Sequence, residues 1–513
     1  MNGAESLVRT LIESGVDTCF TNPGTSEMHF VAALDQVPGM RSVLGLFEGV
    51  VTGAADGYAR MANKPAATLL HCGPGLGNGI ANLHNAQKAG SPVVNIVGDH
   101  ATWHVAYNAP LTADVEGLAK PVSAWVKTSK SSKDVATDGA AAVAASMQYP
   151  GCIASLILPG DTAWEEATAA APAQPTPAIP ALDNSAVTNA AARLKNGKRT
   201  AILMGARTLR EQPLKTAARI AAATGATLIA PTANARMTRG AGIVTIESVP
   251  YPVDQALEFL ADYEQIITVC AQEPVAFFAY PNKPSSLMPV GCELIELAAR
   301  DQDGVDALQK LASELGAESD VEITRHDLPP LPLGERLTPE VINAIAAHRM
   351  PEQAIVIDEA VTAGRSLQEL TAGAAVHDLL QIVGGSIGIG PPLAVGAAIA
   401  CPDRKVLALQ ADGSAMYTLQ ALWTQAREQL DITTVIYANR AYAILQHELK
   451  NVGAKTGKVA QDMMRLDMPE LDFVSLAKGM GVEGERVTTA DEFDRALQKG
   501  LATDGPYLIE ASY

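Results

Sequence analysis

Short apolar segments alternate with segments of helical character along nearly the whole chain. In the first third, apolar runs at residues 66–71 and 93–97 flank a helical stretch at 78–89. The same alternation continues in the middle third with apolar runs at 200–204, 227–230 and 265–269. In the last third, apolar runs at 354–358 and 406–410 precede a helical stretch at 416–429. Strands that alternate with helices form mostly parallel sheets covered by helices on both faces. We therefore predict an α/β fold.

Two proline-rich segments divide this alternation into three parts. Residues 166–182 are mostly Ala and Pro, a composition typical of a semi-rigid linker, and a Leu-Pro-Pro-Leu-Pro patch occupies 328–332. A chain of 513 residues is long enough for three domains of ordinary size. We predict three consecutive doubly wound, mostly parallel sheet domains at 1–165, 183–327 and 345–513, with 166–182 as a linker.

Charge and cysteine content narrow the class of protein. The net charge is −18 and no Lys/Arg-rich run occurs, so we expect no nucleic-acid partner. The six cysteines are scattered without a CxxC pair, which indicates a reduced, cytoplasmic protein. The first 15 residues lack the apolar core of a signal peptide.

One segment has the length and polarity of a membrane span. Residues 379–400 contain no charged side chain, but several glycines and the pair Pro391-Pro392 interrupt them. A lipid-exposed helix broken there would leave backbone groups without hydrogen-bond partners. We predict a buried loop leading into a buried helix, and no membrane partner.

The strongest chemical signal lies at the ends of two apolar segments of the last third. Asp412 follows the apolar run 406–410, and Asn439 follows the run 433–438, one strand–helix–strand unit later. Adjacent parallel strands would direct both side chains into one crevice, where ligands bind in open α/β sheets. A carboxylate and an amide oxygen suit Mg²⁺, and Ser414 lies where a helix start can receive phosphate. A plain turn with a helix cap remains the alternative.

Two further features could contribute to such a site. The loop Gly384-Gly385-Ser386-Ile387-Gly388 can cradle phosphates or admit a flat heterocycle, although an ordinary glycine turn has the same pattern. Glu48 follows an apolar strand expected at 42–47 and precedes a helix of small residues. Desolvation there would raise its pKa and suit it to proton transfer, whereas the alternative is a simple acid at a helix start.

Histidines provide the remaining candidates. His71 ends an apolar strand and precedes residues 73–77, which we expect to form a glycine loop, so it is placed for acid–base chemistry. His29 is the second candidate because it follows the turn Asn22-Pro23-Gly24. Cys72 has no evident partner base and is interpreted as a small buried residue.

Together and in this order, these segments resemble the thiamine diphosphate-dependent 2-oxo acid decarboxylase and acetolactate synthase superfamily. Three parts of the first third resemble its pyrimidine-binding domain: residues 21–27, Glu48 together with residues 55–60, and residues 73–78. Residues 411–414 through 438–439 resemble its diphosphate and Mg²⁺ motif, although Ala411 and Ala438 depart from the usual GDG and NN. The resemblance implies a pyrimidine-binding domain, a middle Rossmann-like domain and a diphosphate-binding domain in the three predicted ranges.

The resemblance also implies cofactors and roles. Thiamine diphosphate and Mg²⁺ are expected; FAD is not, because the synthases' flavin-contacting motifs are missing from the middle third. Glu48 matches the glutamate that bonds the aminopyrimidine and helps form the ylid, and Ile387 the apolar wedge between the two rings. The remaining matches are the Mg²⁺ ligands Asp412, Asn439 and the carbonyl of Ala441, and the cofactor-contacting residues Gly385, Ser386, Gly413, Ser414 and Tyr442.

The implied reaction is decarboxylation of a 2-oxo acid through the ylid and a carbanion–enamine. The resemblance also allows carboligation, in which the carbanion–enamine attacks a second carbonyl compound. The matches follow the benzoylformate decarboxylases most closely, since His71 and Thr25 match an active-site histidine and serine of that group. Its second histidine has no counterpart near 275–280. An acetolactate synthase-type transferase and a non-catalytic cofactor-binding paralogue remain alternatives. Family active sites lie between chains, so a homodimer or homotetramer is expected.

Overall fold

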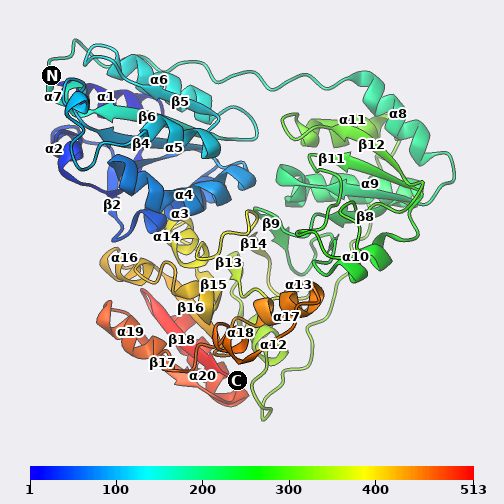
Figure 1. Ribbon diagram of the computed structural model, residues 1–513. Helices are drawn as coiled ribbons and strands as arrows, with labels where there is room; N and C mark the ends of the chain where they lie inside the picture. The colour runs from blue at the N-terminus through cyan, green and yellow to red at the C-terminus, as the bar shows by residue number, and fades with distance from the viewer.

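The computed structural model describes residues 1–513 and contains three mostly parallel sheets, each with helices packed on it (Figure 1). The prediction of three consecutive α/β sheets is therefore confirmed.

The first sheet has the strand order β2-β1-β3-β4-β6-β5. Its strands are β1 Thr18–Asn22, β2 Arg41–Leu44, β3 Ala66–His71, β4 Val93–Asp99, β5 Trp125–Thr128 and β6 Ile153–Pro159. Its helices are α1 Gly3–Glu13, α2 Met28–Gln36, α3 Glu48–Ala62, α4 Cys72–Ala89, α5 Val115–Ala119, α6 Val135–Ser146 and α7 Gly160–Trp164, with 3-10 turns at Thr25–Glu27, Val105–Tyr107 and Lys120–Val122.

The second sheet has the order β10-β8-β7-β11-β12 and follows an irregular stretch after α7. Its strands are β7 Thr200–Met204, β8 Thr227–Ala230, β10 Glu247–Ser248, β11 Gln265–Val269 and β12 Glu293–Ala298. Its helices are α8 Asn184–Leu194, α9 Glu211–Thr224, α10 Val253–Leu260 and α11 Gly304–Leu315, with a 3-10 turn at Ala206–Leu209.

The third sheet has the order β17-β18-β16-β15-β13-β14-β9. Its edge strand β9, Met237–Arg239, comes from the middle of the chain and runs antiparallel to β14. The other strands are β13 Ala354–Glu359, β14 His377–Gln381, β15 Val406–Ala411, β16 Ile432–Ala438, β17 Glu483–Val487 and β18 Tyr507–Ser512. The helices are α12 Pro339–Arg349, α13 Leu367–Leu370, α14 Gly390–Ala400, α15 Asp412–Ala415, α16 Ala421–Arg427, α17 Ala443–Asn451, α18 Lys458–Asp462, α19 Phe473–Gly479 and α20 Ala490–Ala502.

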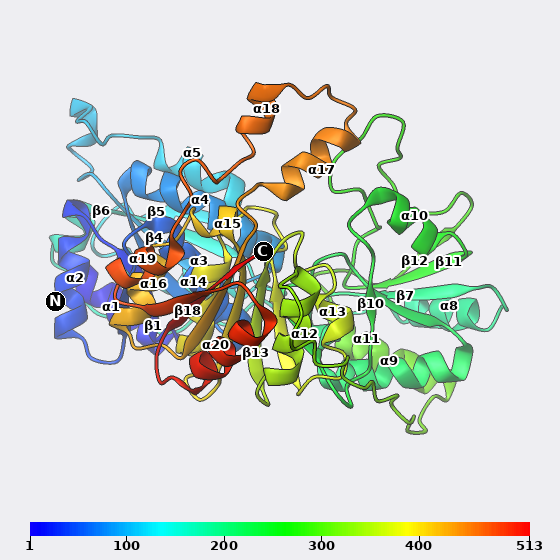
Figure 2. The ribbon, with the colours of Figure 1, turned by 90° about the horizontal axis from the view of Figure 1, so that it is seen from below.

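Helices α3 and α14 pack directly against each other and join the first and third sheets into one core (Figure 2). A Cβ on Gly396 of α14 would overlap the backbone of Ala54 in α3, so the glycine permits the close approach. The charge-free segment consists of the buried strand β14, a loop and α14, which is buried from Gly390 to Ile399. The predicted buried helix is therefore confirmed, but the loop at 382–387 is partly exposed rather than buried, because it lies outside the α3–α14 contact. No helix of the structure combines the length and the apolar character needed to cross a membrane.

Three local expectations were wrong. Residues 73–77 are helical, because α4 begins at Cys72; its Pro74 lies in the first turn, where no backbone donor is needed. The strand expected at 42–47 ends at Leu44. The helix expected at 416–429 is the short α16, since a separate turn of helix, α15, forms at the end of β15.

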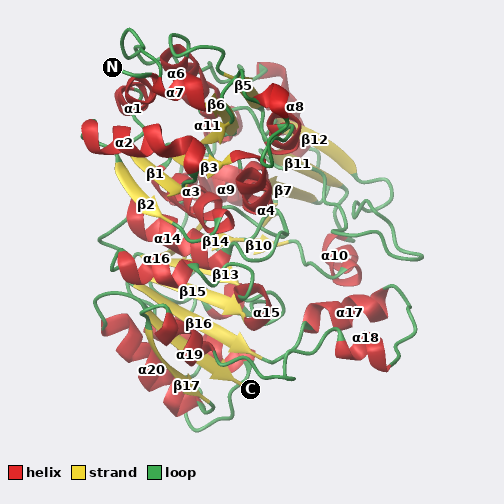
Figure 3. Cartoon of the chain, turned by 60° about the vertical axis from the view of Figure 1, so that its left-hand side comes forward, coloured by secondary structure: helices red, strands yellow, loops and turns green.

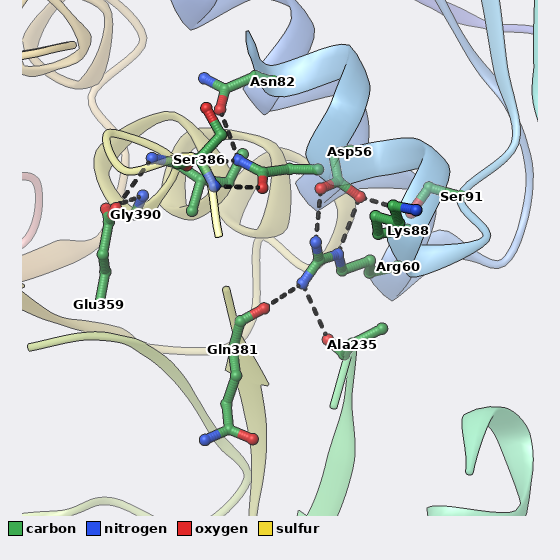
Figure 4. Close-up of polar contacts among 12 residues, drawn as sticks. Asp56, Arg60, Asn82, Lys88, Ser91, Ala235, Glu359, Gln381, Ser386 and Gly390 are labelled. Atoms are coloured by element: carbon green, nitrogen blue, oxygen red, sulfur yellow. Dashed lines mark hydrogen bonds and ion pairs between the residues drawn. The ribbon is translucent and has the colours of Figure 1, made fainter. Parts of the chain in front are cut away.

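A buried ion pair ties all three parts of the chain together (Figure 4). Arg60 of α3 donates to Asp56 through Nε at 2.8 Å and through Nη2 at 2.6 Å, and the Ser91 hydroxyl donates to the same carboxylate. The Arg60 Nη1 group donates to the carbonyls of Ala235, near β9, and Gln381, in β14. This network fixes the end of α3 against the third sheet.

Candidate cofactor and active site

Asp412 lies buried at the carboxyl end of β15, beside the end of its parallel neighbour β16. Its Oδ1 accepts a hydrogen bond from the Gly413 N–H at 2.7 Å, and its Oδ2 accepts one from the Arg440 N–H at 2.6 Å. The Asn439 Oδ1 accepts from the Ala441 N–H at 2.9 Å. The structure thus brings Asp412 against the turn of residues 439–441, so that the three residues proposed as Mg²⁺ ligands lie together. We call this group the Asp412 turn.

Burial dominates the electrostatics of this turn. It raises the pKa of Asp412 to about 6, while the N–H groups of Arg440 and Gly413 act in the opposite direction. The oxygen atoms at the turn belong to a carboxylate, an amide and backbone carbonyls, which is the donor set of a hard cation such as Mg²⁺. The donor chemistry therefore fits the expected metal.

Tyr442 covers the glycine that follows Asp412. A Cβ on Gly413 would overlap the Tyr442 ring, so only glycine leaves room for this contact. Burial also raises the pKa of the Tyr442 hydroxyl. Gly413 and Ser414 follow Asp412, the first residue of α15. Gly413, Ser414 and Tyr442, all predicted to contact the cofactor, therefore lie beside Asp412.

The glycine loop before α14 is held by a buried glutamate that the sequence reasoning missed. Glu359, at the end of β13, accepts hydrogen bonds from Gly388 N–H on Oε1 and from Gly390 N–H on Oε2, each at 2.6 Å, and a longer one from Ile389 N–H (Figure 4). Burial raises its pKa to about 7, and these N–H groups oppose the shift. Glu359 follows an apolar strand just as Asp412 does, so the same pattern could have identified it.

The other end of the loop is held by α4. The Asn85 amide donates to the Ser386 carbonyl at 2.7 Å and accepts from the Ser386 N–H at 3.2 Å, and His84 contacts the Gly384 carbonyl at 3.0 Å. Ile387, the expected wedge, is partly exposed between these two anchors. The loop is therefore fixed at both sides while its centre faces outward.

An aromatic side chain from the middle of the chain reaches this loop. Gly385 has φ +75°, and a Cβ on it would lie 2.5 Å from Cζ of Phe277. Phe277 and Phe278 are each more than half exposed, and the Phe277 ring lies 5.5 Å from that of Tyr251. Tyr251 in turn donates to Glu448 of α17 at 3.4 Å. Figure 3 shows α17 and α18 outside the layers of the third sheet, beside α10. No local sequence pattern indicates this contact, because it joins distant segments.

Glu48 begins α3 and faces α4. Its Oε2 accepts a hydrogen bond from the Asn78 amide at 3.0 Å, and a Cβ on Gly75 would lie 3.2 Å from its Oε1. Contrary to the expected desolvation, Glu48 is partly exposed, because nothing in its own chain covers the start of α3. No hydrogen bond links Glu48 to the Asp412 turn within one chain.

His71 lies next to Glu48, since both border the same Gly75. Its Nδ1 lies 2.9 Å from Oε2 of Glu27, a buried carboxylate that also accepts from the Gly24 N–H. Ser26 Oγ lies 3.2 Å from the same ring nitrogen. Glu27 and Ser26 were both missed by the sequence reasoning, although they lie inside the segment 21–27 that it singled out.

The two remaining candidates lie at the edge of this group. Thr25 is exposed, and its neighbour Ser26 makes the contact with His71. His29 is exposed on α2, with its ring 5.9 Å from that of Trp164. Catalytic roles for Thr25 and His29 remain predictions.

Comparisons with known proteins concern the family and the fold of the chain. Residues 1–118 match the family profile described as "Thiamine pyrophosphate enzyme, N-terminal TPP binding domain", and residues 370–511 match "Thiamine pyrophosphate enzyme, C-terminal TPP binding domain". Thiamine pyrophosphate is another name for thiamine diphosphate. The chain is 49% identical to IlvX of Mycobacterium tuberculosis, a protein named as an acetolactate synthase large subunit, over 99% of this chain and 98% of that protein.

More distant relatives bear the decarboxylase name. The chain is 29% identical to benzoylformate decarboxylase of Pseudomonas aeruginosa, covering 97% of this chain and 96% of that enzyme. Among solved structures, the thiamine diphosphate-dependent 4-hydroxybenzoylformate decarboxylase of Rhodococcus jostii RHA1 superposes with a TM-score of 0.85, at 24% identity over 100% of this chain and 99% of the other. This last likeness concerns the fold.

Proposed function

Because this chain belongs to the thiamine pyrophosphate enzymes of the decarboxylase and acetolactate synthase family, we propose that it decarboxylates a 2-oxo acid with the help of thiamine diphosphate and Mg²⁺. The observation that carries the proposal is the pairing of two sites: the Asp412 turn with its oxygen donors, and the Glu48–His71 pair beside Gly75. When bound, the cofactor supplies an electron sink for the pair of electrons left as CO₂ departs.

The residues of the third sheet would hold the metal and the diphosphate. Asp412, Asn439 and the Ala441 carbonyl would ligate Mg²⁺, which prefers such oxygen donors. Gly385, Ser386, Gly413 and Ser414 would lie along the phosphates, and Ile387 would hold the two rings apart. The anchoring of the loop by Glu359 and Asn85 supports this role, because an oriented loop loses little conformational freedom on binding.

The residues of the first sheet would move protons. The Asn78 amide donates to the Glu48 carboxylate beside Gly75, where Glu48 would exchange a proton with the aminopyrimidine ring. The hydrogen bond between His71 Nδ1 and the buried Glu27 carboxylate favours the proton on Nδ1. The Nε2 atom of His71 is then free to accept or return a proton at the substrate.

We propose an aromatic or other apolar 2-oxo acid as the substrate, in the benzoylformate-to-pyruvate range. The exposed rings of Phe277 and Phe278, together with Tyr251, form an apolar wall next to the cofactor loop. Such a wall favours an apolar substituent on the 2-oxo acid by burying its surface. Leu445 on α17 would extend the same wall.

We further propose that the active unit is at least a homodimer and that each site lies between two chains. Glu48 is partly exposed in the single chain and is not linked to the Asp412 turn. Trp103, Tyr107 and Leu111 form an exposed apolar stretch in the segment that follows β4. A second chain would cover such surface and desolvate Glu48.

A screen of 2-oxo acids for CO₂ release, with and without thiamine diphosphate and Mg²⁺, tests the proposal. We expect release that requires both additions, with benzoylformate preferred over pyruvate and an aldehyde as the product. Cofactor binding without turnover of any 2-oxo acid would contradict the proposal and favour a non-catalytic paralogue.

The second candidate is an acetolactate synthase-type transferase that joins two 2-oxo acids. It is favoured by the 49% identity to a protein that bears the synthase name. Product analysis with pyruvate as the sole substrate separates the two functions: acetolactate would identify the transferase, and acetaldehyde the decarboxylase.

A further inference from the structure

Four donor atoms meet at the carboxyl end of β3. Oε2 of Glu27 lies 2.9 Å from Nδ1 of His71, and Sγ of Cys72 lies 3.8 Å from the same nitrogen. All three of these atoms lie within 4.8 Å of one another. Ser26 Oγ lies 3.2 Å from both His71 Nδ1 and Cys72 Sγ. A carboxylate, an imidazole, a thiol and a hydroxyl thus face one another across one small gap.

The spacing of these atoms is close to that of a tetrahedral metal site. Bonds of about 2.0 Å to nitrogen or oxygen and about 2.3 Å to sulfur separate neighbouring ligand atoms by about 3.3–3.5 Å. The His71–Glu27 and His71–Cys72 separations each differ from that range by less than about half an ångström. Two of the three separations therefore match ligands of one ion, and the Glu27 and Cys72 donor atoms lie within 4.8 Å of each other. Ser26 Oγ or a water would take the fourth position.

The donor types select the ion. Glu27 and Cys72 are each 1% exposed, whereas the His71 side chain is 24% exposed, so the cluster is open to solvent only on the His71 side. Sulfur and imidazole donors favour Zn²⁺ over Mg²⁺. Burial raises the pKa of the Cys72 thiol to about 11, with Glu27 adding to the shift, so an ion that binds must displace the thiol proton.

We propose that Glu27, His71 and Cys72 form a binding site for Zn²⁺, separate from the Asp412 turn, and that zinc held there blocks the reaction. The inhibition by zinc rests on the proposed function, because it requires that the His71 ring, once bound to zinc, can no longer transfer protons at the substrate. The binding does not, because it needs only the three ligands.

Cobalt spectroscopy of the purified full chain, without cofactor, tests the binding. Co²⁺ replaces Zn²⁺ in such sites, and a Co²⁺–thiolate bond gives a charge-transfer band that oxygen-only sites such as the Asp412 turn lack. We expect the band in the wild type and in the control C152A, its displacement by one equivalent of Zn²⁺, and its absence in C72A. No band in the wild type, or an undiminished band in C72A, would overturn the site.

A second variant covers the possibility that C72A does not fold. E27Q keeps the thiol but removes the carboxylate ligand, so the charge-transfer band should persist. The affinity for Co²⁺ should fall at least tenfold, because even the loss of a residue that only supports a metal ligand typically costs about that much. Unchanged affinity in a folded E27Q protein would contradict the role of Glu27.

Inhibition assays then separate the two halves of the proposal. In excess Mg²⁺, Zn²⁺ should inhibit CO₂ release by C152A at concentrations at least tenfold lower than those needed for C72A. Equal inhibition of both variants would overturn the blocking by zinc. A cobalt band through Cys72 in a chain that turns over no 2-oxo acid would leave the metal site standing and refute the proposed function instead.

Discussion

The substitution D56N is expected to loosen the junction of the three sheets. The Asp56 side chain is fully buried and that of Arg60 is 2% exposed, so the guanidinium would lose its only carboxylate partner without gaining water. Breaking a buried ion pair in this way costs about 3–5 kcal/mol, because one charge stays buried and uncompensated. The carbonyls of Ala235 and Gln381 still accept from Arg60 and limit the loss to the lower part of that range.

Hydrogen exchange of the backbone amides measures this effect where it occurs. Since about 1.4 kcal/mol corresponds to a factor of ten, exchange in α3 and α14 should speed up roughly a hundredfold or more. The matched control is D262N, which removes the exposed partner of Arg199 and should change exchange by a factor of about five or less. The double variant D56L/R60M, which removes both charges, should recover much of the protection. Less than a tenfold change in D56N, or a change equal to that of D262N, would refute the reasoning.

Three further perturbations follow from the packing of the glycine loop at 384–388 and of the core. G385A should weaken thiamine diphosphate binding about tenfold in a calorimetric titration. An alanine at φ +75° is strained by roughly 1–2 kcal/mol, and its Cβ would also meet Phe277. G15A is the control, because its alanine would carry the same kind of backbone strain in open space. Because burial raises the folded-state pKa of Glu359 to about 7, the folded chain retains a proton that the unfolded chain releases, so the free energy of unfolding should fall as pH rises from about 5 to 7. In urea unfolding, E359Q should lack this contribution. The same dependence of the unfolding free energy on pH in both proteins would contradict the assignment. G396V should lower the melting temperature and the yield of folded protein, because its side chain would overlap α3 and overpacking costs about 1–3 kcal/mol or more; wild-type melting would show that the two helices can separate without loss.

The strands that could be predicted from the sequence are those with a short continuous run of mainly apolar residues, which is almost entirely buried in β3, β7 and β11 and exposed at its start in β8. β3, β7, β8 and β11 begin and end where the apolar runs do. The edge strand β9 was not expected, because its pairing with β14 depends on a neighbour far away in the sequence. Residues 73–77 were assigned to a loop because glycine suggests flexibility, whereas here small residues let α4 pack against Glu48 and Thr52.

Parts of the candidate site could also be predicted, because they directly follow strands that are recognisable as apolar runs. Asp412 and Asn439 follow adjacent parallel strands, and that register places Asp412 against the turn that contains Asn439. The partners that hold the site together come from elsewhere: Asn85 contacts the glycine loop from helix α4, and Phe277 contacts it from the middle of the chain. Such contacts arise from the packing of whole sheets, which no local spacing encodes.

The central claim is that Glu48 drives the chemistry of a cofactor that the Asp412 turn holds. The most direct test compares the wild type with E48Q for thiamine diphosphate binding and for CO₂ release from benzoylformate in the presence of Mg²⁺. We predict that both proteins bind the cofactor with similar affinity and that E48Q releases CO₂ at least a hundredfold more slowly, a loss typical of removing a general acid–base group. Undiminished CO₂ release by E48Q would contradict the account.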